Sequence, residues 1–204
     1  MSIYKLGLTG SIGMGKSTTA KMFRDAGIPV FDSDAVVHSL YARGGKAVPI
    51  IEAAFPGSVI GGEVSRARLS DALAANPSGF DRLNAIVHPL VAAKRQAFLE
   101  EARLAGASLV VFDIPLLFET GAETGVDGIL VVTAPEAVQR ERVLGREGMT
   151  EAKFKQILSR QVPDAEKRKR ADFLIDTSLG LDVARKSVEE LISGLKAGSN
   201  QARE

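Results

Sequence analysis

The chain has 204 residues, a length typical of one compact core with insertions rather than of several independent domains. Hydrophobic residues make up 45% and charged residues 25%, which is the composition of an ordinary globular protein and excludes collagen, a pure coiled coil and wholesale disorder. The 26 Lys and Arg and the 25 Asp and Glu leave a formal net charge of +1, which argues against a nucleic-acid coat protein or a polybasic membrane binder.

The chain contains no cysteine. This excludes disulfides, thiolate-bound metals and cysteine nucleophiles, and it fits a reducing compartment, so we expect a cytoplasmic protein. No run approaches the roughly 18 consecutive apolar residues of a membrane span, and the first residues lack the layout of a signal peptide. We therefore expect no membrane partner, and we expect the polar residues 198–204 to form a flexible tail.

The elements predicted along the chain alternate between strands and helices. An apolar run at 4–9 predicts the first strand, a helical pattern follows at 18–26 with Gly27 as its terminator, and 28–31 predicts a second strand. Further apolar runs at 108–112 and 128–133 predict strands buried on both faces, and the run at 173–175 predicts a fifth strand. This alternation predicts an α/β fold with a parallel sheet flanked by helices.

Two long segments interrupt the alternation. Residues 35–106 are too long for one crossover and contain several helical patches separated by Gly and Pro, so we expect a mostly helical, substrate-binding insertion. Residues 139–170 are expected to form a basic helical lid. The core would then consist of residues 1–34, 107–138 and 171–197.

Residues 10–17, GSIGMGKS, match the pattern G-x-x-x-x-G-K-[ST] between a predicted strand and a predicted helix, which is the context of a phosphate-binding loop, the P-loop. Its glycines let the backbone curl its N–H groups around a phosphate at a helix N-terminus. Lys16 would bind the β- and γ-phosphates, and Ser17 would offer a hydroxyl ligand to Mg²⁺. The sequence therefore predicts a P-loop nucleoside-triphosphate-binding core.

Carboxylates follow two of the predicted strands, where ligands of open α/β sheets collect. Asp32 and Asp34 follow the second strand, and Asp113 follows the run at 109–112. Phosphoryl transfer to an alcohol needs one carboxylate to orient or deprotonate the acceptor hydroxyl and often another to position Mg²⁺. We expect these three to share those tasks, with Asp32 and Asp113 near the metal. Asp34 is also a candidate N-cap for the following helix, and the two uses are not exclusive.

The lid segment 139–170 carries a net charge of +5, and the rest of the chain −4. Arg142 and Arg146 are expected on one face of a helix, where their guanidinium groups could reach a bound triphosphate. Lys153, Lys155 and most basic residues at 167–170 are expected to be solvated. Such a flap would exclude water and so limit futile ATP hydrolysis.

The two histidines give little chemistry by themselves. A chain with two histidines and no cysteine is a poor candidate for a metalloprotein. On physical grounds His88 is expected at a helix end before Pro89, and His38 on a helix face has no assigned role.

These motifs together resemble one family, the dephospho-coenzyme A kinases, over about residues 3–180. The resemblance rests, beyond the loop, on the segments 30–34 (VFDSD), 83–89 (LNAIVHP) and 113–119 (DIPLLFE), on Gln139, Arg142 and Arg146, and on the pairs Arg160-Gln161 and Ala171-Asp172. Ser11 and Met14 stand where the family more often has Gly and Ser, and Thr177 stands where it usually has Asn, a departure that bears on an adenine contact.

The resemblance implies ATP-dependent phosphorylation of the ribose 3′-hydroxyl of dephospho-CoA, the last step of coenzyme A synthesis. It implies that Asp34 is the base, that Lys16, Arg142 and Arg146 assist transfer, and that His88, Pro89 and Leu116 contact the acceptor. It also implies that ATP contacts the loop and its flanks at Thr9, Gly10, Gly13, Met14, Gly15, Lys16, Ser17 and Thr18. A monomer or weak homo-oligomer is expected.

Two alternatives remain open. A nucleoside or nucleotide kinase with another acceptor would use the same chemistry. A P-loop switch protein is disfavoured because the chain has no Asn-Lys-x-Asp guanine-recognition motif. Nucleic acid is not expected as a partner, since aromatic residues are only 5% of the chain and none lies within 167–170.

Overall fold

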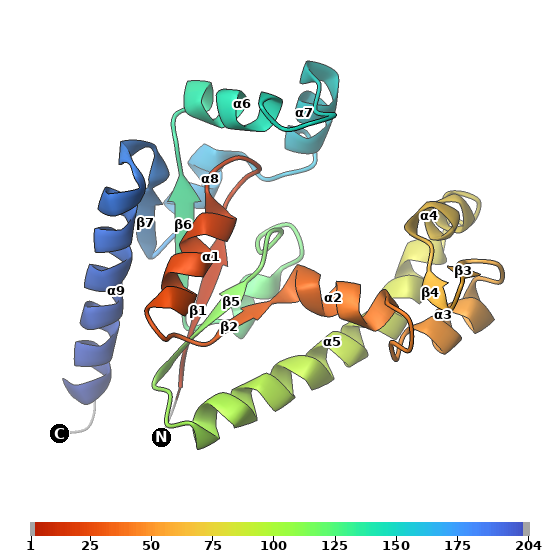
Figure 1. Cartoon of the computed structure of the whole chain (residues 1–204), viewed down its shortest axis with the longest axis horizontal. Helices are drawn as coiled ribbons and strands as arrows, with labels where there is room; N and C mark the ends of the chain where they lie inside the picture. Colours follow the sequence, from red (N-terminus) through yellow and green to blue (C-terminus); the bar gives the residue numbers. More distant parts are fainter. Residues whose placement is uncertain (1–2, 202–204) are drawn as a thin grey trace. The chain divides into compact units, whose positions relative to one another are not determined.

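A computed structural model describes the backbone of residues 3–201 and the side chains of residues 3–197 (Figure 1). The chain forms two compact units, one containing the residues up to Phe31 and from Ala102 onward, the other Asp32–Glu101. We expected residues 198–204 to form a flexible tail. Residues 198–201 belong to the end of the last helix, and residues 202–204 lie outside the described range. Within that range, no helix combines the length and the apolar character that crossing a membrane requires.

The first unit is built on a five-stranded sheet with the order β2-β5-β1-β6-β7. Every adjacent pair among β5, β1, β6 and β7 is parallel, as the continuous apolar runs predicted. The strands span Val30–Asp32 (β2), Leu109–Asp113 (β5), Tyr4–Thr9 (β1), Gly128–Thr133 (β6) and Phe173–Asp176 (β7). The predicted α/β class with a central parallel sheet is therefore confirmed.

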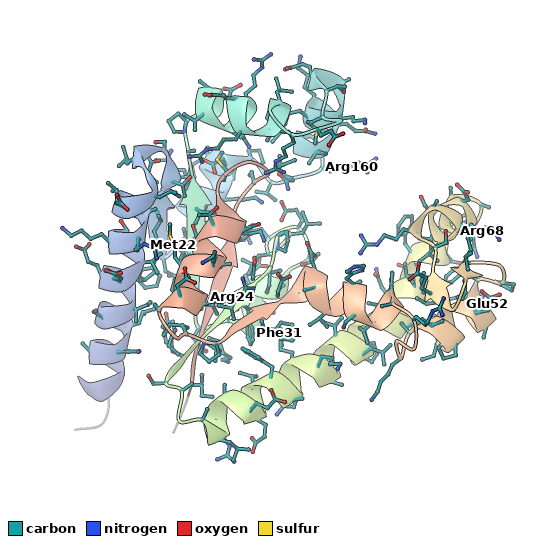
Figure 2. The ribbon with its side chains drawn as sticks, viewed as in Figure 1. Met22, Arg24, Phe31, Glu52, Arg68 and Arg160 are labelled. Atoms are coloured by element: carbon teal, nitrogen blue, oxygen red, sulfur yellow. The ribbon has the colours of Figure 1, made fainter. Side chains whose placement is uncertain are left out.

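Helices α1 (Lys16–Asp25) and α9 (Leu181–Gln201) pack on one face of this sheet (Figure 1). Met22, labelled in Figure 2, comes from α1 and belongs to the same buried cluster as Val188 of α9 and Leu8 of β1. Alternate residues of the strands face the other side, where Val131 packs with Leu117 and Phe118. Three shorter helices follow β6, namely α6 (Glu136–Leu144), α7 (Glu151–Leu158) and α8 (Asp164–Lys169). Two 3-10 turns lie at Ala122–Gly125 (η1) and Thr177–Leu179 (η2).

The second unit is mostly helical and has its own apolar core. Its elements are α2 (Ser33–Tyr41), α3 (Val48–Ala54), β3 (Val59–Ile60), β4 (Glu63–Val64), α4 (Arg66–Ala74) and α5 (Gly79–Leu104), the last of which ends in the first unit. Buried residues of α2, α3, β4 and α4 form one cluster, to which α5 adds partly buried side chains. This cluster is separate from the core around the sheet, so the second unit has an apolar core of its own.

The antiparallel hairpin β3–β4 was not predicted in the insertion. Gly61 and Gly62 connect its strands, and both have positive φ, the conformation that a two-residue hairpin turn requires. Glu52 accepts hydrogen bonds from the N–H groups of Gly57 and Val59, and Figure 2 labels it with Arg68, whose side chain bonds the Gly57 carbonyl.

The expectation that a helix ends at Pro89 is wrong. Pro89 lies inside α5, a helix of 26 residues. A proline in a helix interior removes one backbone hydrogen bond, but here residues on either side of it, including Ile86, Val87 and Leu90, are buried or packed against the apolar core of the second unit. Tertiary packing therefore outweighs the local cost of the proline.

Candidate active site

The loop between β1 and α1 has the geometry of an anion-binding site. Gly13 and Gly15 have φ values of 80° and 87°, which side chains other than glycine rarely adopt. A Cβ atom at Gly13 would lie 2.5 Å from the Cγ2 atom of Val143, so α6 also packs too closely for a larger residue. The first turn of α1 contains no acidic residue, which leaves the positive end of the helix available to an anion.

Lys16, at the start of α1, lies beside Asp113. The register of the sheet pairs Leu8 of β1 with Asp113 of β5, which brings the end of β5 next to the loop. The Lys16 Nζ atom is 2.5 Å from Asp113 Oδ1, and the two side chains are only 17% and 5% exposed. Thr9 is fully buried, and its hydroxyl donates to the Pro115 carbonyl at 3.2 Å. Thr9, Lys16 and Asp113, three of the predicted site residues, thus lie together at the carboxyl ends of β1 and β5.

A cavity of about 240 Å³ opens beside the loop, and two arginines line it. Gly13, Gly15 and Thr18 form part of its wall, and Arg142, Arg146 and Thr177 form another part. Positive charge, backbone N–H groups and a cavity therefore meet at the predicted nucleotide site. This combination can bind a polyphosphate and the group attached to it.

The expectation that Arg142 and Arg146 share one helix face is wrong. Helix α6 ends at Leu144, and Arg146 lies in the following turn, where its N–H bonds the Val143 carbonyl. Gly145 is the C-cap residue of α6, and its N–H bonds the Glu141 and Val143 carbonyls of the last turn, so Arg146 lies one residue beyond the cap. Both arginines nevertheless line the same cavity.

Two glutamine side chains contact the loop, and no role was predicted for either. Gln139 of α6 donates from Nε2 to the Ile12 carbonyl at 2.7 Å, and Gln161 accepts at Oε1 from the Ile12 N–H at 3.1 Å. The only sequence signal for them is their presence among the motifs that carry the family resemblance. Contacts over such long separations leave no periodic pattern in a single sequence.

Lys167 is fully buried, whereas Arg168, Lys169 and Arg170 are exposed, as expected for most basic residues at 167–170. Its Nζ atom lies 2.9 Å from Glu119 Oε1, and the same oxygen accepts from the Val162 N–H at 2.8 Å. Burial alone would raise the pKa of Glu119, but the Lys167 ammonium and the backbone N–H groups hold it below its ordinary value. The ion pair therefore ties α8 to the segment that follows β5.

In the second unit, Asp32 rather than Asp34 is the N-cap of α2, so that expectation is corrected. Asp32 Oδ1 accepts from the Ala35 N–H at 2.9 Å because Asp32 has the extended backbone of an N-cap residue. Asp34 lies in the first turn of α2 and is exposed. It lines a cavity of about 430 Å³ with Arg66 and Phe80, among other residues.

The remaining predicted acceptor contacts lie on exposed positions. His88 and Pro89 are exposed residues of α5, in the second unit. Leu116 belongs to the first unit, where it is 42% exposed in the segment after β5. The residues described include no cluster of three or more His, Asp or Glu side chains that would form a metal site by itself.

Comparison with known proteins identifies the family. The dephospho-CoA kinase (CoaE) family model matches residues 4–182. The dephospho-CoA kinase of Agrobacterium fabrum is 56% identical over 192 residues, which cover 94% of this chain and 98% of that protein. The enzyme of Mesorhizobium japonicum is 58% identical over 191 residues, which cover 94% of this chain and 96% of that protein.

Solved structures agree in fold. A Thermus thermophilus protein superposes with a TM-score of 0.80 at 34% identity and covers 96% of this chain and 99% of its own. The dephospho-CoA kinase of Campylobacter jejuni has a TM-score of 0.70 at 22% identity, with 95% of this chain and 98% of that one covered. The family match spans both the phosphate-binding loop and the helical second unit, and the chain belongs to the dephospho-CoA kinase family.

Proposed function

We propose that this chain transfers the terminal phosphoryl group of ATP to the ribose 3′-hydroxyl of dephospho-CoA, giving CoA and ADP. The observation that carries the proposal is the combination at the loop: Lys16 beside Asp113, with Arg142 and Arg146 lining the adjoining cavity. Phosphoryl transfer depends mainly on positioning and on stabilising charge, and these groups supply both.

ATP would bind with its phosphates on the backbone N–H groups of residues 13 and 15–18, and Met14, whose own N–H donates to the Ser11 carbonyl at 3.1 Å, would shape the loop around them. The Lys16 ammonium would contact the β- and γ-phosphates, and the arginines would neutralise charge that develops during transfer. The Lys16–Asp113 pair supports this arrangement, because it holds the ammonium at the end of the sheet next to the loop. Gly10 begins the loop and packs closely on β6, where a Cβ atom would lie 2.6 Å from Val132 Cγ2.

The acceptor would bind to the second unit. Asp34 is exposed within the cavity of about 430 Å³, and an exposed carboxylate can accept the proton of a substrate hydroxyl. Arg66 adds a positive charge to the same cavity, suited to the diphosphate of dephospho-CoA, and Phe80 adds an apolar surface. We assign Asp34 as the general base, and His88, Pro89 and Leu116 as further acceptor contacts.

Mg²⁺ fits the hard oxygen donors at the site. Ser17 is exposed in the first turn of α1 and would offer its hydroxyl, and Asp113 would offer a carboxylate at the end of β5. Mg²⁺ usually keeps several waters and needs few protein ligands, so the absence of a three-carboxylate cluster among the described residues does not conflict with it. When bound, the ion would neutralise phosphate charge. Asp32 is the third candidate, although capping of α2 engages its Oδ1 atom.

We further assign residues 139–170 as a lid that excludes water. Helix α6 begins at Glu136, ahead of this segment, and α7 and α8 fall within it. Arg142 reaches the loop region from α6, which supports a role for this segment at the phosphates. A cytoplasmic location and a monomer or weak homo-oligomer stay predictions from the sequence.

A coupled assay with ATP, Mg²⁺ and dephospho-CoA tests the function. We expect ADP formation that depends on dephospho-CoA, with the new phosphate on the 3′-oxygen. Equal or faster turnover with nucleosides or nucleotides would identify another kinase, and slow hydrolysis without stimulation by any acceptor would identify a switch protein.

The base is tested by Asp34→Asn. We expect it to lower kcat by about 10²- to 10⁴-fold while sparing ATP binding, because a general base contributes to the chemical step alone. Asp71→Asn, at an exposed position of α4 in the same unit, is the matched control and should keep full activity. Retained turnover in Asp34→Asn would remove Asp34 from the mechanism.

A further inference from the structure

Ile12, in the middle of the phosphate-binding loop, has both of its backbone polar groups bound by side chains. Gln139 Nε2 donates to the Ile12 carbonyl at 2.7 Å, and Gln161 Oε1 accepts from the Ile12 N–H at 3.1 Å. The partners fix the orientation of each amide, since a carbonyl oxygen needs a donor and an N–H needs an acceptor. Gln139 is only 5% exposed, so its contact is protected from water.

These contacts determine where a phosphate-binding N–H points. The described backbone contains no cis peptide, so the Ile12 carbonyl and the Gly13 N–H point in opposite directions across one planar bond. When Gln139 fixes that carbonyl, it also fixes the direction of the Gly13 N–H. Gln161 acts in the same way on the preceding peptide and fixes the Ser11 carbonyl, which accepts from the Met14 N–H at 3.1 Å.

The loop needs this support because its glycines are flexible. A Gly-rich segment has more accessible backbone conformations than any other, and ordering it costs conformational entropy. Gln139 lies at the start of the segment 139–170, in α6, and Gln161 lies further along it, in the turn after α7. A single segment therefore holds the loop through two side chains.

The Gln161 side of this arrangement is itself supported. The next residue, Val162, donates its N–H to Glu119 at 2.8 Å, and Glu119 pairs with the fully buried Lys167 at 2.9 Å. The Gln139 side is supported by packing. Val143, in the same helix, lies so close to Gly13 that a Cβ atom placed there would be 2.5 Å from the Val143 Cγ2 atom. Neither glutamine depends on a flexible, solvent-exposed backbone for its position.

We propose that Gln139 and Gln161 are positioning residues that preorganise the phosphate-binding loop by clamping Ile12, and so couple the loop to the segment 139–170. They act on the nucleotide through the backbone of Ile12. The inference rests on the proposed kinase function, and it assigns a role in nucleotide binding to two residues outside the loop motif.

A pair of isosteric variants tests the clamp. Gln139→Glu and Gln161→Glu add the same negative charge, but a carboxylate can only accept a hydrogen bond. Gln161→Glu keeps the bond from the Ile12 N–H, and Gln139→Glu loses the donor and faces a carbonyl. We expect kcat/KM for ATP to fall at least about tenfold further in Gln139→Glu than in Gln161→Glu, the size of effect of one lost hydrogen bond at a charged site. KM for dephospho-CoA should be unchanged in both.

Two apolar variants, Gln139→Met and Gln161→Met, each remove one of the two bonds without adding charge. They replace the glutamate variants as the test if a buried glutamate prevents folding. Each should lower kcat/KM for ATP and weaken the binding of ADP, measured by calorimetry, with little change in the binding of adenosine. Equal kinetics in the two glutamate variants, or methionine variants that bind ADP as well as the parent chain, would overturn the proposal. An inactive parent chain would instead overturn the proposed function.

Discussion

The guanidinium group of Arg142 donates hydrogen bonds to two atoms of Thr177, the side-chain hydroxyl at 2.8 Å and the backbone carbonyl at 2.7 Å. The same hydroxyl lies 3.0 Å from the Met14 carbonyl, inside the phosphate-binding loop. Thr177 therefore accepts from the arginine while it can donate to the loop, and it links the two. Thr177, which departs from the residue that the family resemblance led us to expect, thus has a defined structural role here.

Removing the Thr177 hydroxyl should separate Arg142 from the loop. In Thr177→Val the volume is nearly unchanged, but Arg142 loses one acceptor and the Met14 carbonyl loses a donor. We expect KM for ATP to rise about tenfold, the effect of losing about 1.4 kcal/mol of binding. Thr177→Ser keeps the hydroxyl and should retain near-normal kinetics. Equal KM values for the two variants would show that the hydroxyl does not orient the arginine.

Gly13 should tolerate no side chain. Gly13→Ala combines a positive φ with a Cβ atom 2.5 Å from Val143, so we expect it to lower the free energy of unfolding and to abolish ATP binding. Gly27→Ala is the matched control, since Gly27 also has a positive φ, of 76°, but a Cβ atom placed there would meet nothing within 4 Å. It should cost only the backbone strain of about 1–2 kcal/mol and leave activity intact. Similar losses in both variants would contradict the close packing of α6 on the loop.

Two variants at Asp32 separate helix capping from a metal role. Asp32→Ala removes the N-cap of α2 and should cost about 1 kcal/mol of stability, and Asp32→Asn should keep the cap because asparagine is an equally good N-cap residue. If Asp32 also positions Mg²⁺, the Asp32→Asn variant should fold normally but require a higher Mg²⁺ concentration for half-maximal activity. An unchanged Mg²⁺ dependence would leave Asp32 with the capping role alone.

The Glu119–Lys167 pair should make stability depend on pH. The folded-state pKa of Glu119 lies below its ordinary value of 4.5, so its ionised form stabilises the fold at neutral pH, and this contribution disappears as the pH falls through the folded-state pKa. Glu119→Gln leaves the buried Lys167 charge unpaired and should cost about 3 kcal/mol at pH 7. The difference from the parent chain, measured by denaturant unfolding, should narrow below about pH 4.5.

Glu123→Gln is the control for that pair, because it removes the negative charge from the more exposed contact with Arg170. It should change the free energy of unfolding by at most about 1 kcal/mol. An equal loss in the two variants, or a constant gap between Glu119→Gln and the parent chain across the acidic range, would contradict the assignment.

The sheet and the loop could be predicted because local patterns specify them. The apolar runs at 4–9 and 128–133 coincide with β1 and β6, since strands buried on both faces need continuous apolar residues. The loop motif combines fixed spacing with a strand before it and a helix after it. The fold class followed from these features, and the family resemblance rested in addition on the order and spacing of the later segments.

Contacts between distant segments could not be predicted. Nothing local distinguishes Lys167 from the exposed basic residues beside it, because its burial depends on Glu119, far away in the chain. Pro89 indicated a helix end, and only the packing of α5 shows why the helix continues. Arg146 lies beyond α6 because a turn at Gly145 interrupts a pattern that looks helical. The catalytic roles stay predictions until the variants are measured.

The contacts that shape the phosphate-binding loop span most of the chain: Ile12 is 127 and 149 residues from its two glutamine partners, and Met14 is 163 residues from Thr177. A ribosome-bound chain that ends before these partners has the complete loop motif but lacks the side chains that hold it. Nucleotide affinity should therefore arise late in synthesis, once α6, the turn after α7 and η2 have emerged and docked.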